Sequence, residues 1–222
     1  MKILLIENRI ERLEKFSKIK EYKIIDIYTG EKIKKLKEKI AENNLESLNS
    51  YSAMMLHSSY FTQSERSKIK NYCQNNKYPL VFFSGGISQA TYDSKKFPFL
   101  NIGVKDFYSE KLIQFIQHTE QTGTIELRLL QFGPEWKLSL LYDLRNNLSN
   151  IIYQYESQTK NNKICTLSLS ELEKLNQHEA FELLDEVLKE KFNHICKVGS
   201  KIDHISSLEE LKKELNEFIK AQ

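Results

Sequence analysis

The segment Lys2–Ile6 near the start of the chain contains a short, continuously apolar run, Ile3–Ile6, that is bounded by the polar residues Lys2 and Glu7. Such a segment is typical of a strand buried on both faces, as in a parallel sheet covered by helices. Apolar residues then recur at helical spacing from Ile10 to Ile19. A buried strand followed by an amphipathic helix is the repeating unit of α/β folds, and it constrains this chain more than any other feature.

The same alternation continues to about residue 120. Later strands are expected at residues 23–28, 53–56, 79–83 and 99–104, with helices between them and after the last one. Parallel strands need crossover connections, and these are right-handed, so few topologies remain. We therefore predict an α/β domain over residues 1–120, with a flavodoxin-like five-stranded parallel sheet in the order 2-1-3-4-5.

After about residue 120 the pattern becomes helical, and residues 124–130 fit either a short strand or the start of a helix. An amphipathic helix is predicted at 136–155 and a helical stretch at 172–196. The remaining expectations are a polar loop at 158–163, a helix cap at Ser168 or Ser170, a break at Val198–Ser200, and a last helix capped by Ser206 or Ser207. We predict a helical domain over residues 121–222.

Charge and composition exclude several classes of protein. The chain has 33 Lys and Arg against 30 Asp and Glu, a net charge of +3 that is far from a nucleic-acid footprint. With 40% hydrophobic residues, a folded protein is expected. A run of basic residues between two strands is either a solvated helix face or a patch for an acidic partner. Its members are Lys32, Lys34, Lys35 and Lys37.

Cysteine spacing and hydropathy predict a cytoplasmic protein that does not enter a membrane. Cys73, Cys165 and Cys196 are odd in number and far apart, so neither a disulfide framework nor a zinc pattern is visible. The N-terminus lacks a signal-peptide layout, and no apolar run reaches the length of a membrane span.

The order of elements, together with the segments KILLIEN, LVFFSGG and NIGVKDF, resembles the receiver domain of bacterial response regulators over residues 1–118. In that family an acidic pair after the first strand holds Mg²⁺, and an aspartate ending the third strand accepts a phosphoryl group. A Ser or Thr after the fourth strand and a Lys after the fifth bind the phosphoryl oxygens. These groups meet at the carboxyl ends of the strands.

The resemblance implies a degenerate pocket in this chain. Glu7 and Asn8 stand for the acidic pair, so one carboxylate remains, and His57 stands where the acceptor aspartate belongs. Ser84 and Lys105 match the family pattern. Because Mg²⁺ prefers oxygen ligands, the exchange at His57 removes a metal ligand and the acceptor together. The resemblance therefore implies a pseudo-receiver with no phosphotransfer and no cofactor, Mg²⁺ being the ion that such a pocket would otherwise hold.

Each of these residues also has a structural interpretation. Ser84-Gly85-Gly86 is either an anion nest of backbone N–H groups or a tight turn that requires positive φ. Glu7 could pair with Lys105, and Ser84 and Lys105 could be surface or turn residues. A histidine such as His57 is more often packed or hydrogen-bonded than catalytic.

The segment Tyr142–Leu148, which reads YDLRNNL, is similar to the phosphoacceptor helix of sensor histidine kinases, with Tyr142 where the histidine belongs. The similarity implies a second degenerate signalling element and a dimeric four-helix bundle, hence a homodimer through the C-terminal helices. The alternative is an ordinary amphipathic helix.

Three functions follow. The first is a non-enzymatic regulatory protein that binds a protein partner through an aromatic cluster. The alternative role of this cluster is to cap the domain's own hydrophobic core against the helical half. The cluster comprises Tyr92, Phe97, Phe99, Phe107 and Tyr108, and Tyr142 is a further candidate for the interface. The second is a phosphate- or nucleotide-binding sensor or enzyme in which Glu7, His57, Ser58, Ser84 and Lys105 converge. The third, nucleic-acid binding, is disfavoured by the acid-rich helix at 171–190.

Overall fold

The computed structural model describes residues 1–160, 169–198 and 204–222. The chain divides into two compact units, an α/β unit of Met1–Pro134 and a helical unit of Glu135–Gln222. The sequence had suggested a boundary at residues 120 and 121. The later boundary has a physical reason, because Lys111 Nζ donates to the Gln131 carbonyl at 2.6 Å and ties residues beyond 121 to the α/β unit.

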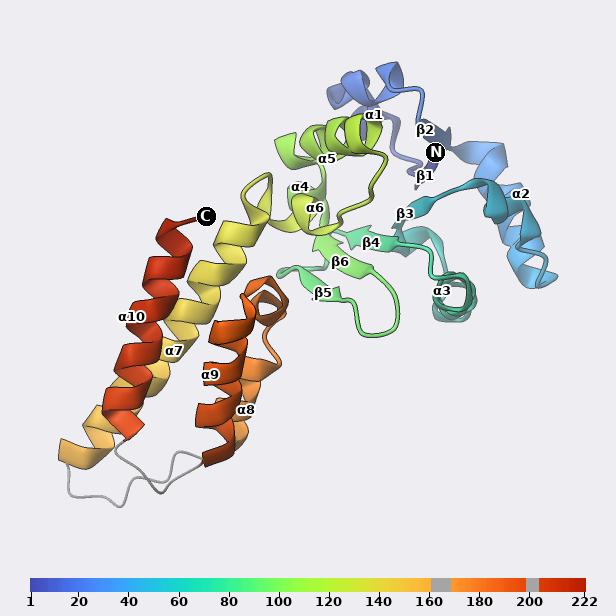
Figure 1. Cartoon of the computed structure of the whole chain (residues 1–222). Coiled ribbons are helices and arrows are strands. Elements are labelled where there is room, and N and C mark those ends of the chain that lie inside the picture. The colour runs from blue at the N-terminus through green and yellow to red at the C-terminus, as the bar shows by residue number, and fades with distance from the viewer. Residues whose placement is uncertain (161–168, 199–203) are drawn as a thin grey trace. The chain divides into compact units, whose positions relative to one another are not determined.

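The α/β unit contains a six-stranded sheet in the order β2-β1-β3-β4-β6-β5, and its strands are labelled in Figure 1. The strands are β1 Ile3–Ile6, β2 Ile25–Tyr28, β3 Ala53–His57, β4 Leu80–Ser84, β5 Thr91–Asp93 and β6 Phe99–Gly103. All neighbouring strands pair parallel except β5, which pairs antiparallel with β6. The predicted α/β class is confirmed, but the predicted five-stranded sheet is incomplete, because the edge strand β5 was not foreseen.

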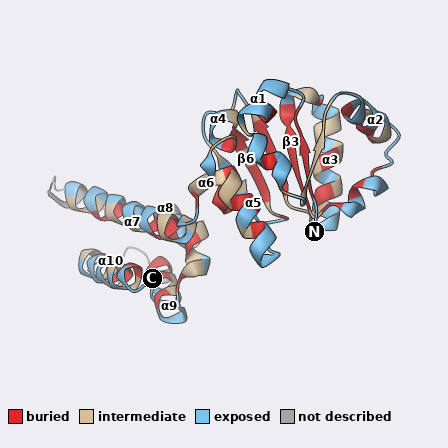
Figure 2. Ribbon diagram, turned by 90° about the horizontal axis from the view of Figure 1, so that it is seen from above, coloured by how far each residue is buried: buried red, intermediate tan, exposed pale blue. Residues whose placement is uncertain are grey.

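Helices cover both faces of the sheet (Figure 1). Their bounds are α1 Ile10–Lys15, η1 Ser17–Glu21, α2 Gly30–Ala41, η2 Glu46–Ser50, η3 Ser58–Tyr60, α3 Gln63–Asn76, α4 Val104–Phe107, α5 Glu110–Thr122 and α6 Arg128–Phe132. Figure 2 shows the buried strands between these layers. On one face, Leu4, Leu56 and Phe82 share a core with α2 and α3. Side chains alternate along strands, so Phe83 points to the other face, where Phe107 of α4 stacks on it at 4.0 Å.

The connection from β4 to β6 contains β5 and no helix. It crosses β6 closely: a Cβ on Gly103 would lie 2.7 Å from the carbonyl oxygen of Ile87. Glycine is therefore required at Gly103 because the crossing backbone leaves no room for a side chain. Because this crossover supplies no helix, the face of the sheet beside α3 is left partly open.

Two predictions near the ends of the α/β unit can be compared with the structure. The helical spacing from Ile10 to Ile19 corresponds to α1 and a 3-10 turn that begins at Ser17, although Ile10 itself is 64% exposed. Of the two alternatives for residues 124–130, the structure has the start of a helix: α6 begins at Arg128, and its residues Leu129 and Leu130 are buried.

The helical unit consists of α7 Trp136–Lys160, α8 Leu169–Asn176, η4 Glu179–Leu183, α9 Glu186–Val198 and α10 His204–Lys220. Helix α7 packs on α10, η4 and α8, and α9 packs on α8 and α10. Leu144, Leu148, Phe192, Leu208 and Leu215 form fully buried parts of this core. The apolar stripe predicted on α7 is therefore covered by other helices of the same chain.

The predicted continuous helical stretch at 172–196 is broken in two places. His178 Nδ1 accepts from the backbone N–H of Ala180 at 3.1 Å, and Asp185 Oδ1 accepts from that of Leu188 at 2.8 Å. These side chains end one helix and begin the next, although the apolar spacing continues through them. The last helix starts at His204, so Ser206 and Ser207 lie inside it rather than capping it.

Other expectations fall at the limits of the described residues. Helix α7 continues to Lys160, so the start of the predicted 158–163 loop is helical. Ser170 lies within α8, and residues 161–168, 199 and 200 lie outside the described residues. Across the described ranges, none of the helices combines the length and apolarity that a membrane span needs.

Candidate functional site

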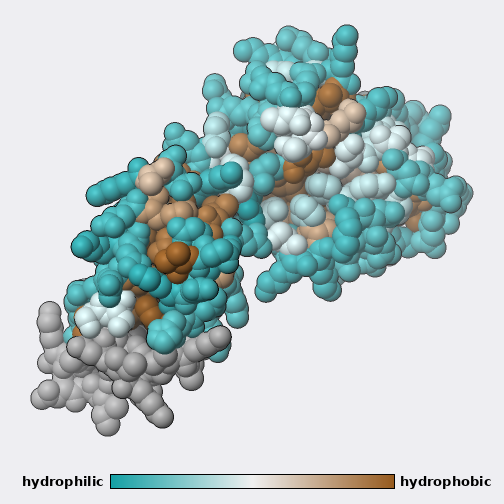
Figure 3. Space-filling view, viewed as in Figure 1, coloured by the Kyte–Doolittle hydropathy of each residue, from teal (hydrophilic) through white to brown (hydrophobic). Residues whose placement is uncertain are grey.

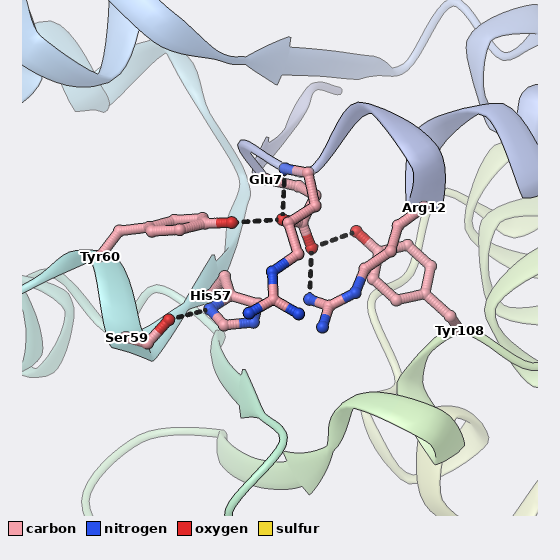
Figure 4. Close-up of polar contacts among 7 residues, drawn as sticks. Glu7, Arg12, His57, Ser59, Tyr60 and Tyr108 are labelled. Atoms are coloured by element: carbon pink, nitrogen blue, oxygen red, sulfur yellow. Dashed lines mark hydrogen bonds and ion pairs between the residues drawn. The ribbon is translucent and has the colours of Figure 1, made fainter.

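The carboxylate of Glu7 lies fully buried at the carboxyl end of β1 and receives four hydrogen bonds (Figure 4). Oε1 accepts from the Tyr60 hydroxyl at 2.7 Å and from the Arg9 backbone N–H at 2.9 Å. Oε2 accepts from Arg12 Nη1 and from the Tyr108 hydroxyl, both at 3.1 Å. We call these five residues the Glu7 site. Both oxygens are engaged by the protein itself.

The site determines how its groups ionise. Burial raises the pKa of the Glu7 carboxyl, but the bonds from Arg9, Tyr60 and Arg12 together outweigh burial and hold the pKa below its ordinary 4.5. Burial, helped by the bond to the carboxylate, raises the pKa of Tyr60 to about 12. The pKa of Tyr108 is raised for the same two reasons. Glu7 is thus a charged acceptor, and both phenols remain protonated donors.

His57, at the end of β3, is packed among aromatic rings. It is 2% exposed, stacks on Tyr60 at 4.7 Å and meets Phe83 edge-on at 5.2 Å. Nδ1 and the Ser59 hydroxyl are 2.7 Å apart, whereas Nε2 is buried without a hydrogen-bond partner in the described part of the chain. Burial lowers the pKa of the imidazole, against a smaller opposite effect of Glu7. Because its pKa is lowered, the ring is neutral at pH 7, and it packs against Tyr60 and Phe83. This arrangement agrees with the interpretation of His57 as a packed rather than a catalytic histidine.

The remaining pocket residues of the receiver resemblance do not join the Glu7 site. Asn8 is exposed, and its side-chain oxygen accepts from the Gly30 backbone N–H at 3.0 Å, at the start of α2. Lys105 is exposed on α4 and forms no hydrogen bond or ion pair with any described residue. The pairing of Glu7 with Lys105 is therefore wrong, because Arg12 takes that place.

Ser58 and Ser84 line a groove on the α3 side of the sheet, away from His57. Gly85 and Gly86 follow Ser84 in an exposed turn, and neither has positive φ. The turn therefore does not depend on glycine, and it lacks the alternation of φ sign that forms an anion nest. The structure thus brings Glu7 and His57 together and separates them from Ser58, Ser84 and Lys105.

The predicted aromatic cluster is largely internal to the α/β unit. Phe97, Phe99 and Phe107 are 4%, 7% and 0% exposed, respectively. The Tyr108 hydroxyl is directed to Glu7, and the Tyr92 ring lies 4.9 Å from the Arg128 guanidinium. Phe97, Phe99 and Phe107 therefore belong to the core of their own unit.

In the helical unit, the segment similar to a phosphoacceptor helix lies in α7 (Figure 1). Leu144 and Leu148 are buried, while Tyr142 is 41% exposed with the Arg145 guanidinium 5.0 Å from its ring centre. Asp143 lies 3.0 Å from His178 Nε2. The side chain of Tyr142 thus lies at the surface of the helical unit.

Sequence reasoning missed Arg12, Tyr60 and Tyr108 as members of the Glu7 site. Arg12 lies five residues from Glu7, and a basic residue in the first helix after an acidic strand end is a signal that could have identified it. Tyr60 and Tyr108 lie 53 and 101 residues from Glu7, and nothing local in the sequence indicates such contacts. Within the described residues, no group of three or more His, Cys, Asp or Glu side chains could hold a metal ion.

Comparisons with known proteins give no relative. No family model, no curated protein and no solved structure matches this chain.

Proposed function

We propose that this is a non-enzymatic regulatory protein whose α/β unit is a receiver-like module without phosphotransfer, and that it acts by binding a protein partner. The observation that carries the proposal is the saturated carboxylate of Glu7 (Figure 4). A carboxylate with four protein donors offers little to Mg²⁺, because the Arg12 guanidinium already supplies the compensating positive charge.

His57 supports the same conclusion. A phosphoacceptor must be reachable and nucleophilic, whereas this ring is 2% exposed, stacked on Tyr60 and neutral. Lys105, the expected phosphate ligand, is exposed on α4 and makes no hydrogen bond or ion pair with the described residues. This dispersal of the residues that match the receiver pattern supports a module without phosphotransfer.

Exposed apolar side chains on the helical unit support partner binding. Tyr153, Val187 and Tyr142 are 72%, 62% and 41% exposed. In the view of Figure 3, hydrophobic residues gather on the visible face of the helical unit. Aromatic residues are enriched in the cores of protein interfaces, and the aromatic rings buried in the α/β unit are not free for that purpose.

Phosphotransfer is tested by incubating the full chain with Mg²⁺ and acetyl phosphate and measuring intact mass. The expected result is no phosphorylated species and no change in melting temperature. An increase in mass by one phosphoryl group, located at His57 or elsewhere in the α/β unit, would contradict the proposal.

Partner binding is tested by capture from native lysate together with light scattering on the purified chain. We expect either a stoichiometric partner or a homodimer, weakened by Tyr153→Ser and Val187→Ser but not by Ile10→Ser, which changes an equally exposed apolar residue of the α/β unit. A chain that recovers no partner and stays monomeric counts against the function.

A phosphate- or nucleotide-binding sensor is the second candidate, favoured by the Arg66 and Lys70 side chains in the groove beside α3. Nucleic-acid binding is less well supported, because Glu190, Glu210 and Glu214 line the surface pocket between α9 and α10. Such a surface repels a polyanion.

A further inference from the structure

A groove of about 450 Å³ lies on the α3 side of the sheet, and we call it the α3 groove. Phe82 of β4 and Phe99 and Asn101 of β6 line its sheet side, since all three point to the same face. It is open because the crossover from β4 to β6 carries no helix. The missing layer leaves a cavity of the size that small-molecule ligands occupy.

One wall of the α3 groove is a polar stripe of α3. Gln63, Arg66, Ser67 and Lys70 line it, and their spacing of three, four and seven residues places them on one helix face. The hydroxyl residues Ser58 and Ser84 stand at the ends of β3 and β4. The lining residues include two cations, three serines and two carboxamides, but no carboxylate.

No acid among the described residues neutralises the positive charge of the two cations. Arg66 and Lys70 are four residues apart on one helix, an arrangement in which like charges repel. Neither makes an ion pair with a described residue: Arg66 Nη1 reaches only the Ser58 carbonyl at 3.4 Å, and Lys70 Nζ lies 4.0 Å from the centre of the Phe99 ring. Both are half-buried, so solvent compensates them incompletely.

Other charged groups of α3 are already engaged. Lys68 Nζ donates to the Ile40 carbonyl at 3.1 Å, and the Glu65 carboxylate caps α3 at Thr62 and lies 3.7 Å from Lys37 Nζ. Lys68 is thus held at the carbonyl end of α2, whereas Arg66 and Lys70 are the two cations of α3 that line the groove.

We propose that the α3 groove binds a small phosphorylated molecule. The guanidinium of Arg66 matches two phosphoryl oxygens in its planar fork, and the ammonium of Lys70 adds a second positive charge. The hydroxyls of Ser58, Ser67 and Ser84 provide neutral donors, and Phe82 and Phe99, which are mostly buried, form the apolar sheet side of the groove. Free phosphate and a nucleoside monophosphate share this chemistry.

This site is distinct from the Glu7 site. Leu56 faces the core shared with α2 and α3, so its neighbour His57 and the Glu7 carboxylate lie on the other face of the sheet. The proposal therefore stands or falls independently of partner binding and of phosphotransfer.

The test is calorimetric titration of the full chain with inorganic phosphate, AMP and adenosine. We expect both anions to bind and adenosine to bind at least about tenfold more weakly than AMP, because it lacks the phosphoryl group. Binding of phosphate without AMP would assign the groove to the free anion. Addition of AMP should also shift the backbone amide signals of Ser58, Ser84 and Gly86 in a nitrogen–proton correlation spectrum.

Variants locate the site. Arg66→Gln and Lys70→Met, singly and together, should weaken AMP binding by about tenfold or more. Lys105→Met, which removes an exposed cation outside the groove, should leave it unchanged. Melting curves of each variant show whether it is folded, and the single variants serve if the double variant is not.

The proposal is overturned if neither anion binds, if adenosine binds as tightly as AMP, or if the variants at Arg66 and Lys70 bind AMP like the parent chain. It is also overturned if a glutamate-rich peptide binds in the groove and AMP does not, because the occupant is then an acidic protein segment.

Discussion

The hydroxyl of Tyr108 donates a hydrogen bond to the carboxylate of Glu7 across 101 residues of sequence. This contact connects the end of the first strand to the segment that follows the last one. Together with the Tyr60 hydroxyl, 53 residues from Glu7, it holds three strand ends of the parallel sheet in one network.

Tyr108→Phe should lower the free energy of unfolding by about 1.5–3 kcal/mol, the contribution of a hydrogen bond to a charged group. The ring contacts with Phe16, Phe83 and Phe107 are retained, so lost packing does not confuse the result. The measurement is urea unfolding followed by fluorescence. Tyr78→Phe is the matched control, since the Tyr78 hydroxyl has no hydrogen bond in the described chain. Equal effects of the two variants would contradict the prediction.

Glu7→Gln should destabilise the α/β unit by about 3 kcal/mol, the lower end of the range for a broken buried pair, because Arg12 keeps 20% of its side chain exposed. The new amide would also turn an NH₂ group toward protein donors. A double-mutant cycle with Arg12→Met should give a coupling energy of about 1 kcal/mol or more. Effects that simply add would mean that the pair contributes no stability.

The free energy of unfolding should fall in two separate pH ranges as the solution is acidified. The pKa of His57 in the folded chain lies below its ordinary value of 6.5. At a pH between the folded pKa and 6.5, the unfolded chain binds a proton that the folded chain does not, so stability falls as the pH falls below 6.5. Glu7, whose folded pKa is also lowered, contributes fully above 4.5 and loses its contribution below that.

The measurement is the free energy of unfolding between about pH 7.5 and about pH 3. His57→Gln should flatten the upper part of the curve and Glu7→Gln the lower part. If His57→Gln leaves the upper slope unchanged, the imidazole is not held neutral by burial.

Gly103→Ala should destabilise the α/β unit by about 1–3 kcal/mol, the usual cost of overpacking, because the new Cβ would lie 2.7 Å from the backbone oxygen of Ile87. Gly86→Ala is the control: no atom lies within 4 Å of its Cβ position and its φ is not positive, so the change should be near neutral. Thermal unfolding compares the two. Similar losses in both would place the strain elsewhere in the loop.

The sequence predicted those elements whose signal is local and strong. β1 and β3 are runs of apolar residues buried on both faces, and α7 has an apolar stripe of sufficient length. It did not predict β5, because Thr91–Asp93 is three residues long and mostly exposed. It joined α8 and α9 into one stretch, because the capping bonds of His178 and Asp185 do not disturb the apolar spacing.

The site was harder to predict than the fold. The sequence indicated that Glu7 and His57 lie at neighbouring strand ends, which follows from parallel topology alone. It could not indicate that Arg12, Tyr60 and Tyr108 saturate Glu7, because those contacts depend on side-chain geometry after folding. Nor could it indicate the α3 groove, which results from the missing crossover helix.

The short strand β5 has one more consequence. A sheet that ended at β6 would present a five-residue row of unpaired backbone groups, which is a template for polymerisation with other chains. β5 covers that row with only three residues, two of them exposed and one of them the charged Asp93. At this edge, the fold thus ends its sheet with a short and polar strand, which is a poor template for pairing with another chain.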